Sequence, residues 1–210
     1  MSLDHTDGLH YLEKADTDFA HALTLISPLP DRIRPAGFEQ LCKIIIEQQV
    51  SLASAAAIWR RLIAAVSPFT PEKMLELSEE QLRARGLGRH KARYCRALAN
   101  DIISGTLSLE ALDEMNDDAA MSALTEVKGI GRWTAEIYLF SCLGRTDIWP
   151  AGDVALQAAL QHLKKLPTRP GVAEMDKLAE PLRPHRTLAA QILWRYYSDV
   201  VRPSSVDTDD

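Results

Sequence analysis

One carboxylate in the sequence stands where a helix is predicted to begin. Asp153 directly precedes the apolar periodicity of residues 154–163, in the segment WPAGDVALQ. An aspartate in this position accepts hydrogen bonds from the first N–H groups of the helix, and the helix dipole favours its ionised form. Such a carboxylate is available at neutral pH to stabilise a positive charge or to act on water. A simple helix cap is the alternative interpretation, and position alone leaves both open.

The second chemical feature is a glycine turn that ends twenty-two residues before this aspartate, in LTEVKGIGRWTAEIY. The turn Gly129-Ile130-Gly131 allows a sharp reversal with a helix starting at once, so that backbone N–H groups point outward. These donors and the helix dipole suit a phosphate, and Lys128 and Arg132 add positive charge. A tight turn between helices requires glycine in any case, so the turn alone does not establish a ligand.

Helices must position both features, because the alternation of apolar and polar residues that is typical of strands is almost absent. Apolar residues recur at spacings of three and four over residues 38–46, 52–66, 133–143 and 154–163. Asn116 is predicted to cap a helix that runs to Val127, and two last helices end near Tyr197. The sequence therefore predicts an all-α protein in which the glycine turn joins two helices.

The overall charge argues against binding of nucleic acid through bulk positive charge, since the 210 residues carry a formal net charge of -5. Six cations without an intervening acid nevertheless lie in residues 83–96, which also hold a second glycine turn, Gly86-Leu87-Gly88. This basic segment is either a solvated helix face or a phosphate contact. Three widely spaced cysteines without metal-ligand spacing are expected to be reduced core residues.

The pairing of KGIGRWTAEIY with PAGDVALQ resembles the helix-hairpin-helix (HhH-GPD) DNA glycosylase superfamily, in particular its DNA-3-methyladenine glycosylase II branch. The similarity extends to FEQLCKIIIEQQVSLASAAAIWRRL, LRARGLGRHKARYCRALA and LRPHRTLAAQILWRYY, and so covers roughly residues 37–198. It implies a two-lobed helical fold with the active-site cleft between the lobes and without an N-terminal β domain. We expect one lobe over about residues 37–150, a second from 1–36 plus 151–203, and an acidic tail at 204–210.

In this superfamily an aspartate after the hairpin is required for cleavage of the N-glycosidic bond, and the matching residue is Asp153. The resemblance implies that it stabilises the oxocarbenium-like transition state of hydrolysis, with an alkylated purine (3-methyladenine or 7-methylguanine type) as the leaving base in base excision repair. Relatives that also cut the strand carry a lysine two residues after the second hairpin glycine, where this sequence has Trp133. Without that amine no Schiff base forms, so we expect a monofunctional hydrolase without AP lyase activity.

A damaged base must leave the duplex before an enclosed aspartate can act on it, so the resemblance implies base flipping into an aromatic pocket. Trp133 matches an aromatic position of the branch and would stack on a cationic methylated base. Tyr138 and Trp149 are further expected pocket residues. For all three, packing in the core is the alternative interpretation.

Contacts with DNA are expected at three places. Gln48 or Gln49, after the first matched helix, would be the wedge that fills the space left by the flipped base, with a plain helix connection as the alternative. The hairpin and the second glycine turn would bind phosphates. These two sets comprise Lys128, Gly129, Ile130, Gly131, Arg132 and Thr134, and Gly88, Arg89 and Lys91.

Two other functions remain open: a glycosylase for deaminated, mismatched or oxidised bases, and an inactive helix-hairpin-helix DNA-binding module. Asp153 argues against the module. We expect a monomer whose partner is double-stranded DNA containing a damaged base, without a membrane contact. The resemblance implies no metal and no cofactor, and allows a structural monovalent cation at the hairpin. We expect a cytoplasmic, nucleoid-associated protein in a bacterium, or a nuclear one in a eukaryote.

Overall fold

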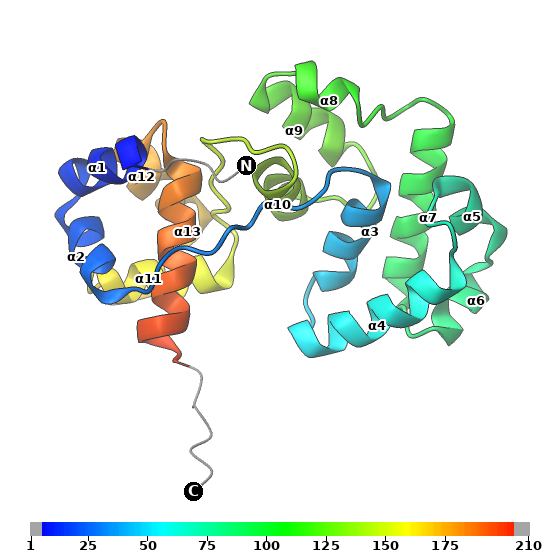
Figure 1. Ribbon diagram of the computed structural model, residues 1–210, viewed down its shortest axis with the longest axis horizontal. Helices are drawn as coiled ribbons and strands as arrows, with labels where there is room; N and C mark the ends of the chain where they lie inside the picture. Colours follow the sequence, from blue (N-terminus) through cyan, green and yellow to red (C-terminus); the bar gives the residue numbers. More distant parts are fainter. Residues whose placement is uncertain (1–5, 204–210) are drawn as a thin grey trace, which may run out of the picture. The chain divides into compact units, whose positions relative to one another are not determined.

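The computed structural model describes residues 6–203, and every regular element among them is a helix (Figure 1). The helices are α1 (Thr6–Ala15), α2 (Thr17–Leu25), α3 (Phe38–Glu47), α4 (Leu52–Ala65), α5 (Pro71–Glu76), α6 (Glu79–Ala84), α7 (Arg89–Ile103), α8 (Ala111–Glu114), α9 (Asp117–Thr125), α10 (Arg132–Ser141), α11 (Val154–Leu163), α12 (Val172–Ala179), the 3₁₀-helix η1 (Glu180–Leu182), α13 (Arg186–Tyr196) and the π-helical turn η2 (Tyr197–Val201). The all-α prediction is confirmed for the described residues.

Side-chain caps fix where several helices begin. Thr70 caps α5, Asn116 caps α9, and Ser78 and Gln81 form a reciprocal capping box at α6. The sequence did not reveal α1 and α2. Between them they bury only Gly8, Leu12, Phe19 and Ala22.

The chain divides into two compact units: unit 1 comprises Met1–Arg32 and Arg145–Asp210, and unit 2 comprises Ile33–Gly144. In unit 2, α7 packs against α3, α5 and α6, while α10 packs against α9 and α3. Helix α3 is buried along most of its length, including Leu41, Ile44 and Ile45. Its Cys42 lies beside Cys95 of α7, and both thiols are buried and free.

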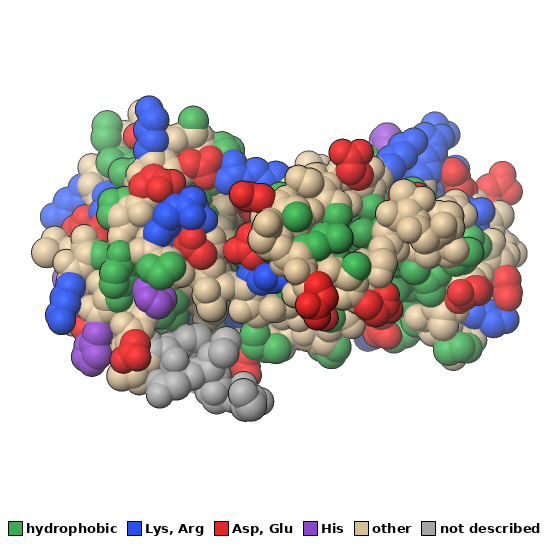
Figure 2. All heavy atoms as spheres, turned by 90° about the horizontal axis from the view of Figure 1, so that it is seen from above, with side chains coloured by type: hydrophobic (Ala, Val, Ile, Leu, Met, Phe, Trp, Pro, Cys, Tyr) green, Lys and Arg blue, Asp and Glu red, His purple; other side chains and the backbone are tan. Residues whose placement is uncertain are grey.

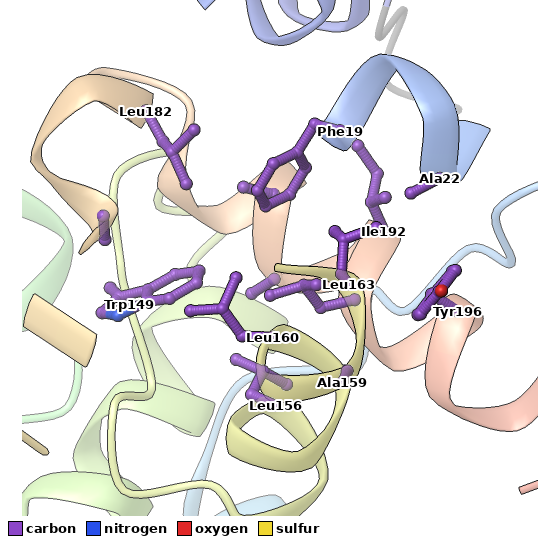
Figure 3. Close-up of a cluster of buried hydrophobic side chains, with 14 of the residues drawn as sticks. Phe19, Ala22, Trp149, Leu156, Ala159, Leu160, Leu163, Leu182, Ile192 and Tyr196 are labelled. Atoms are coloured by element: carbon purple, nitrogen blue, oxygen red, sulfur yellow. The ribbon is translucent and has the colours of Figure 1, made fainter. Parts of the chain in front are cut away.

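Unit 1 is built around the packing of α13 against α11 and α2. Figure 3 shows side chains from these helices converging on one core, among them Phe19, Leu160 and Ile192. Trp149, which precedes α11, is 2% exposed and belongs to the same core. This core therefore anchors the segment that leads into α11.

Acidic and basic side chains are interspersed on the face that Figure 2 presents. This mixture agrees with the formal net charge of -5 and with the expectation that only local patches can attract an anion. Among the described helices, none combines the length and the apolar character that crossing a membrane requires.

Candidate functional site

The predicted hairpin connects α9 to α10, and its two glycines serve different purposes. Gly129 adopts φ +95°, and a Cβ built on it would lie 2.1 Å from Cγ of Tyr94. Gly131 has φ -90° and caps α10 without a side chain, and a Cβ there would meet nothing within 4 Å. Gly129 therefore makes the turn and its contact with α7, whereas Gly131 leaves open space in front of the helix N-terminus.

The residues around the turn separate into buried and exposed ones. The side chains of Ile130 and Thr134 are buried, so Ile130 offers only its backbone to a ligand. Lys128 and Arg132 are exposed. Nε of Arg132 also donates to Oε1 of the buried Glu136 at 2.7 Å, which orients the guanidinium at the start of α10. An uncapped helix N-terminus between two exposed cations is suited to bind a phosphate.

Gln48 does not extend from the protein as a wedge would. Its Nε2 donates to the carbonyl oxygen of Gly129 at 3.1 Å and to Oγ1 of Thr134 at 2.7 Å. Both the amide of Gln48 and the hydroxyl of Thr134, expected to contact DNA, are thus occupied within unit 2. This corrects the prediction for these two side chains, because their hydrogen bonds hold the hairpin instead.

Lys91 likewise points into the protein. Its ammonium donates to the carbonyl oxygens of Ile46 and Gln48, both at 2.7 Å, where α3 ends. Burial lowers the pKa of the Lys91 ammonium. The expected phosphate contact is therefore replaced by a cap on the last carbonyls of α3.

The neighbouring residue, Gln49, is exposed and adopts φ +53°, an uncommon conformation for a residue other than glycine. Val50 beside it is 38% exposed. Of the two glutamines predicted as the wedge, only Gln49 thus stands at the surface, and that role for it stays a prediction.

The second glycine turn repeats the conformation of the first. Gly86 has φ +94°, Leu87 is buried, and Gly88 caps α7 without a side-chain hydrogen bond. Arg89 is exposed at the start of α7, as Arg132 is at the start of α10. The two turns therefore present similar uncapped helix N-termini from the same unit.

Most cations of the basic segment serve the fold. Arg93 pairs with Glu79 at 3.3 Å, Arg85 donates to the carbonyl of Gln81, and Arg96 caps the carbonyls that end α5. Arg93 and Arg85 make these contacts at the surface, so a solvated face stays an open interpretation for them, whereas the contacts of Arg96 are partly buried.

Asp153 caps α11 as predicted. Its Oδ1 accepts hydrogen bonds from the backbone N–H groups of Ala155 and Leu156, both at 3.0 Å. The same oxygen accepts a hydrogen bond from the indole Nε1 of Trp194 at 3.2 Å. Three donors on one oxygen fix the position of the carboxylate at the start of α11.

Trp194 belongs to α13 and is itself held in place. The guanidinium of Arg32 lies over its ring, 5.2 Å from the centroid, and the indole packs against the core of unit 1. No spacing in the sequence indicates the contact of Trp194 with Asp153, because forty-one positions separate them.

The turn before Asp153 is anchored by hydrogen bonds to neighbouring residues. Nε2 of Gln157 donates to the carbonyl of Ala151, and Nε1 of Trp149 donates to the carbonyl of Met175. Oγ1 of Thr187 accepts from the N–H of Ile148. The carboxylate is thus carried by a well-anchored element, as a catalytic group requires.

The structure places two predicted pocket residues in cores. Trp149 is 2% exposed and Tyr138 fully buried, with the phenol oxygen accepting from the N–H of Gly37 at 3.0 Å. Burial raises the pKa of the Tyr138 phenol to about 12. Neither ring has an open face for a base. Trp133 is half-buried near the start of α10. Its stacking on a methylated base stays a prediction.

The chain resembles known DNA repair proteins in sequence and structure. Residues 42–184 match the HhH-GPD superfamily of base excision DNA repair proteins. DNA-3-methyladenine glycosylase 1 of Schizosaccharomyces pombe is 33% identical over 175 residues, covering 79% of this chain and 77% of the relative. The structure of the Schizosaccharomyces pombe 3-methyladenine DNA glycosylase in complex with abasic DNA superposes with a TM-score of 0.83 at 29% identity, covering 90% of this chain and 95% of that one. A DNA-3-methyladenine glycosidase from Bacillus halodurans gives 0.80 at 28% identity, covering 97% and 94%.

Proposed function

Because the chain belongs to the HhH-GPD superfamily of base excision DNA repair proteins, we propose that it is a monofunctional DNA glycosylase that releases alkylated purines from double-stranded DNA. The observation that carries this proposal is the carboxylate of Asp153, fixed at the N-terminus of α11 by three donors on Oδ1. A DNA-binding module needs a hairpin but not this carboxylate. The relatives named 3-methyladenine glycosylases favour an alkylpurine over a deaminated or mismatched base.

The proposed reaction is hydrolysis of the N-glycosidic bond. As the bond between C1′ and the purine nitrogen breaks, its electron pair leaves with the base, and positive charge develops on the deoxyribose. The carboxylate of Asp153 stabilises that charge, and a water adds to C1′ and gives up a proton to the same carboxylate. Alkylation of a ring nitrogen makes the base cationic and thus a good leaving group, so no strong general acid is needed. The reaction requires no metal and no organic cofactor; a monovalent cation at the hairpin stays a prediction.

Absence of strand cleavage is part of the proposal. The position two residues after Gly131 is occupied by Trp133. An indole provides no amine for the Schiff base on which lyase chemistry depends. The product would therefore be an intact strand with an abasic site.

For DNA binding, we propose that the N-termini of α10 and α7 each bind a backbone phosphate, with Arg132 and Arg89 adding charge. Gln49 would enter the duplex from its exposed position after α3. Phosphate contacts at two helix N-termini require no bulk positive charge, which agrees with the mixed surface of Figure 2. We propose that the active form is a monomer.

Incubation of the protein with DNA methylated by an alkylating agent tests the activity directly. We expect chromatography of the supernatant to show 3-methyladenine and 7-methylguanine, and a labelled duplex to break only after alkali treatment. Uracil-containing and hypoxanthine-containing duplexes serve as controls for the alternative substrates. Release of uracil or hypoxanthine without methylpurines would assign the other substrate class, and breaks before alkali would contradict the monofunctional reaction.

Trp194→Phe is expected to lower the rate of base release about tenfold, because it removes the N–H that fixes Oδ1 of Asp153 while keeping an aromatic ring. Affinity for DNA should stay within about twofold of wild type, since no phosphate contact changes. Single-turnover rates at saturating enzyme and fluorescence anisotropy measure the two quantities.

Tyr196→Phe is the matched control, since it removes from the same helix a hydroxyl that contacts Nδ1 of His162 at 2.9 Å. We expect this variant to release base at the wild-type rate. Equal losses in the two variants would show that Trp194 acts through the stability of α13 and not through the carboxylate.

A further inference from the structure

The loop between α3 and α4 holds a two-residue tip, Gln49-Val50, between two fixed ends. On one side, the carbonyl of Gln48 accepts a hydrogen bond from Lys91. On the other side, Oγ of Ser51 caps α4 by accepting from the N–H of Ser54 at 3.2 Å. Gln49 and Val50 are exposed, so the residues that flank them set the position of the tip.

The backbone conformation of Gln49 indicates that neighbouring residues hold the tip in position. A φ of +53° is costly for a glutamine and persists only where the surrounding structure determines it. Lys91 holds the carbonyl immediately before Gln49 and that of Ile46 one turn earlier, both at 2.7 Å. The ammonium thus ties the end of α3 and the entry to the tip to one point on α7.

The same residue that enters the tip also contacts the hairpin. Nε2 of Gln48 donates to the carbonyl of Gly129 within the turn and to Oγ1 of Thr134 in the first turn of α10. Hydrogen bonds therefore run without interruption from α7 through Lys91 and Gln48 to both sides of the hairpin. Within unit 2, this series of hydrogen bonds connects the tip with the N-terminus of α10, which is suited to bind a phosphate.

We propose that Lys91 and Gln48 are positioning residues that fix the tip Gln49-Val50 relative to the hairpin, so that binding of a DNA phosphate by the hairpin places the tip for insertion into the duplex. This inference rests on the proposed function of the hairpin and deepens it. The tip must enter the duplex at a fixed distance from the DNA phosphate that the hairpin binds. A displacement of about 1 Å in a positioned group lowers reaction rates strongly. Neither residue itself touches the substrate.

The experiment uses two nearly isosteric variants of the full chain, Lys91→Met and Gln48→Met, which remove the donors and keep the side-chain length. The probe is a duplex with a tetrahydrofuran abasic analogue and 2-aminopurine in the opposite strand, whose fluorescence rises when the base is unstacked. We expect both variants to bind this duplex within about threefold of wild type, since the packing of Gly129 on Tyr94 keeps the turn in place and its phosphate-binding N–H groups are unchanged. The fluorescence rise should fall by at least half, and base release from methylated DNA at saturating enzyme should fall about tenfold or more.

Arg96→Met is the matched control. Arg96 lies on the same helix as Lys91 and also donates to two carbonyls, those of Leu75 and Leu77 at the end of α5. Its loss should lower the melting temperature of the protein about as much as Lys91→Met does, but leave the fluorescence rise and the rate unchanged. Gln48→Met provides an independent answer where Lys91→Met is too unstable to measure.

The inference would be overturned if Lys91→Met and Gln48→Met both gave the same fluorescence rise as the wild-type protein. A parallel and equal loss of affinity and fluorescence would overturn it too, because the residues would then act through binding alone. A wild-type protein that unstacks the probe without releasing methylpurines would contradict the proposed enzyme, while the fluorescence of the variants would still decide whether Lys91 and Gln48 position the tip.

Discussion

Asp153→Asn is expected to lower the rate of base release by about 10³-fold or more, because the substitution removes the negative charge that stabilises the developing sugar cation. An asparagine side-chain oxygen still accepts from the N–H groups of Ala155 and Leu156, so the cap of α11 remains. The free energy of unfolding, measured in urea, should therefore change by less than about 1 kcal/mol. DNA affinity, measured by anisotropy on the abasic analogue, should stay near that of the wild type.

Asp16→Asn is the matched control in the same unit. Asp16 also caps a helix, α2, by accepting from the N–H of Asp18 at 2.9 Å, and it contacts Lys164 at 2.5 Å. This variant loses a charge at a helix N-terminus as well, yet should release base at the wild-type rate. A rate in Asp153→Asn above a tenth of wild type, or an equal loss in Asp16→Asn, would reject Asp153 as the catalytic carboxylate.

Gly129→Ala is expected to have the largest effect on the hairpin. The new Cβ would lie 2.1 Å from Cγ of Tyr94, and an alanine at φ +95° is strained independently of that contact. Strain and overpacking of this kind cost about 3 kcal/mol or more, so the hairpin or all of unit 2 should open. We expect a large fall in the urea midpoint and loss of DNA binding together.

Gly131→Ala separates folding from binding, since a Cβ there meets nothing within 4 Å and φ is -90°. Its free energy of unfolding should stay within about 0.5 kcal/mol of wild type. Its DNA affinity should fall about tenfold, because the methyl group occupies the space through which a phosphate approaches the N–H groups. Unchanged affinity in Gly131→Ala would contradict a phosphate at this turn, and normal stability in Gly129→Ala would contradict its packing on Tyr94.

Features encoded locally were the ones the sequence predicted well. The caps at Asn116 and Asp153 depend on residues two or three positions apart, and they define helix starts correctly. The same holds for the two glycine turns, because positive φ is a property of single positions. Helices α1 and α2 were not predicted, although the apolar residues of α1 gather on one face about as clearly as those of α7 do.

The roles of polar side chains could not be predicted in the same way. Lys91 and Thr134 are expected to contact DNA because they follow the two glycine turns that would bind phosphates. Lys91, however, lies four residues before the buried Cys95 on the same face of α7, and Thr134 begins the fully buried run of α10. Those spacings are a signal that each side chain turns inward. The contact between Trp194 and Asp153 joins distant segments and leaves no local signal.

The buried thiols have a chemical consequence for a protein that works where methylating agents damage DNA. Such agents react with thiolates far faster than with thiols. Burial raises the pKa of the Cys42 thiol well above its usual range and also raises that of Cys142, while Cys95 is shielded within the core. The cysteines are thus kept protonated or out of reach, so the protein should itself be a poor target for the electrophiles whose products it is proposed to remove.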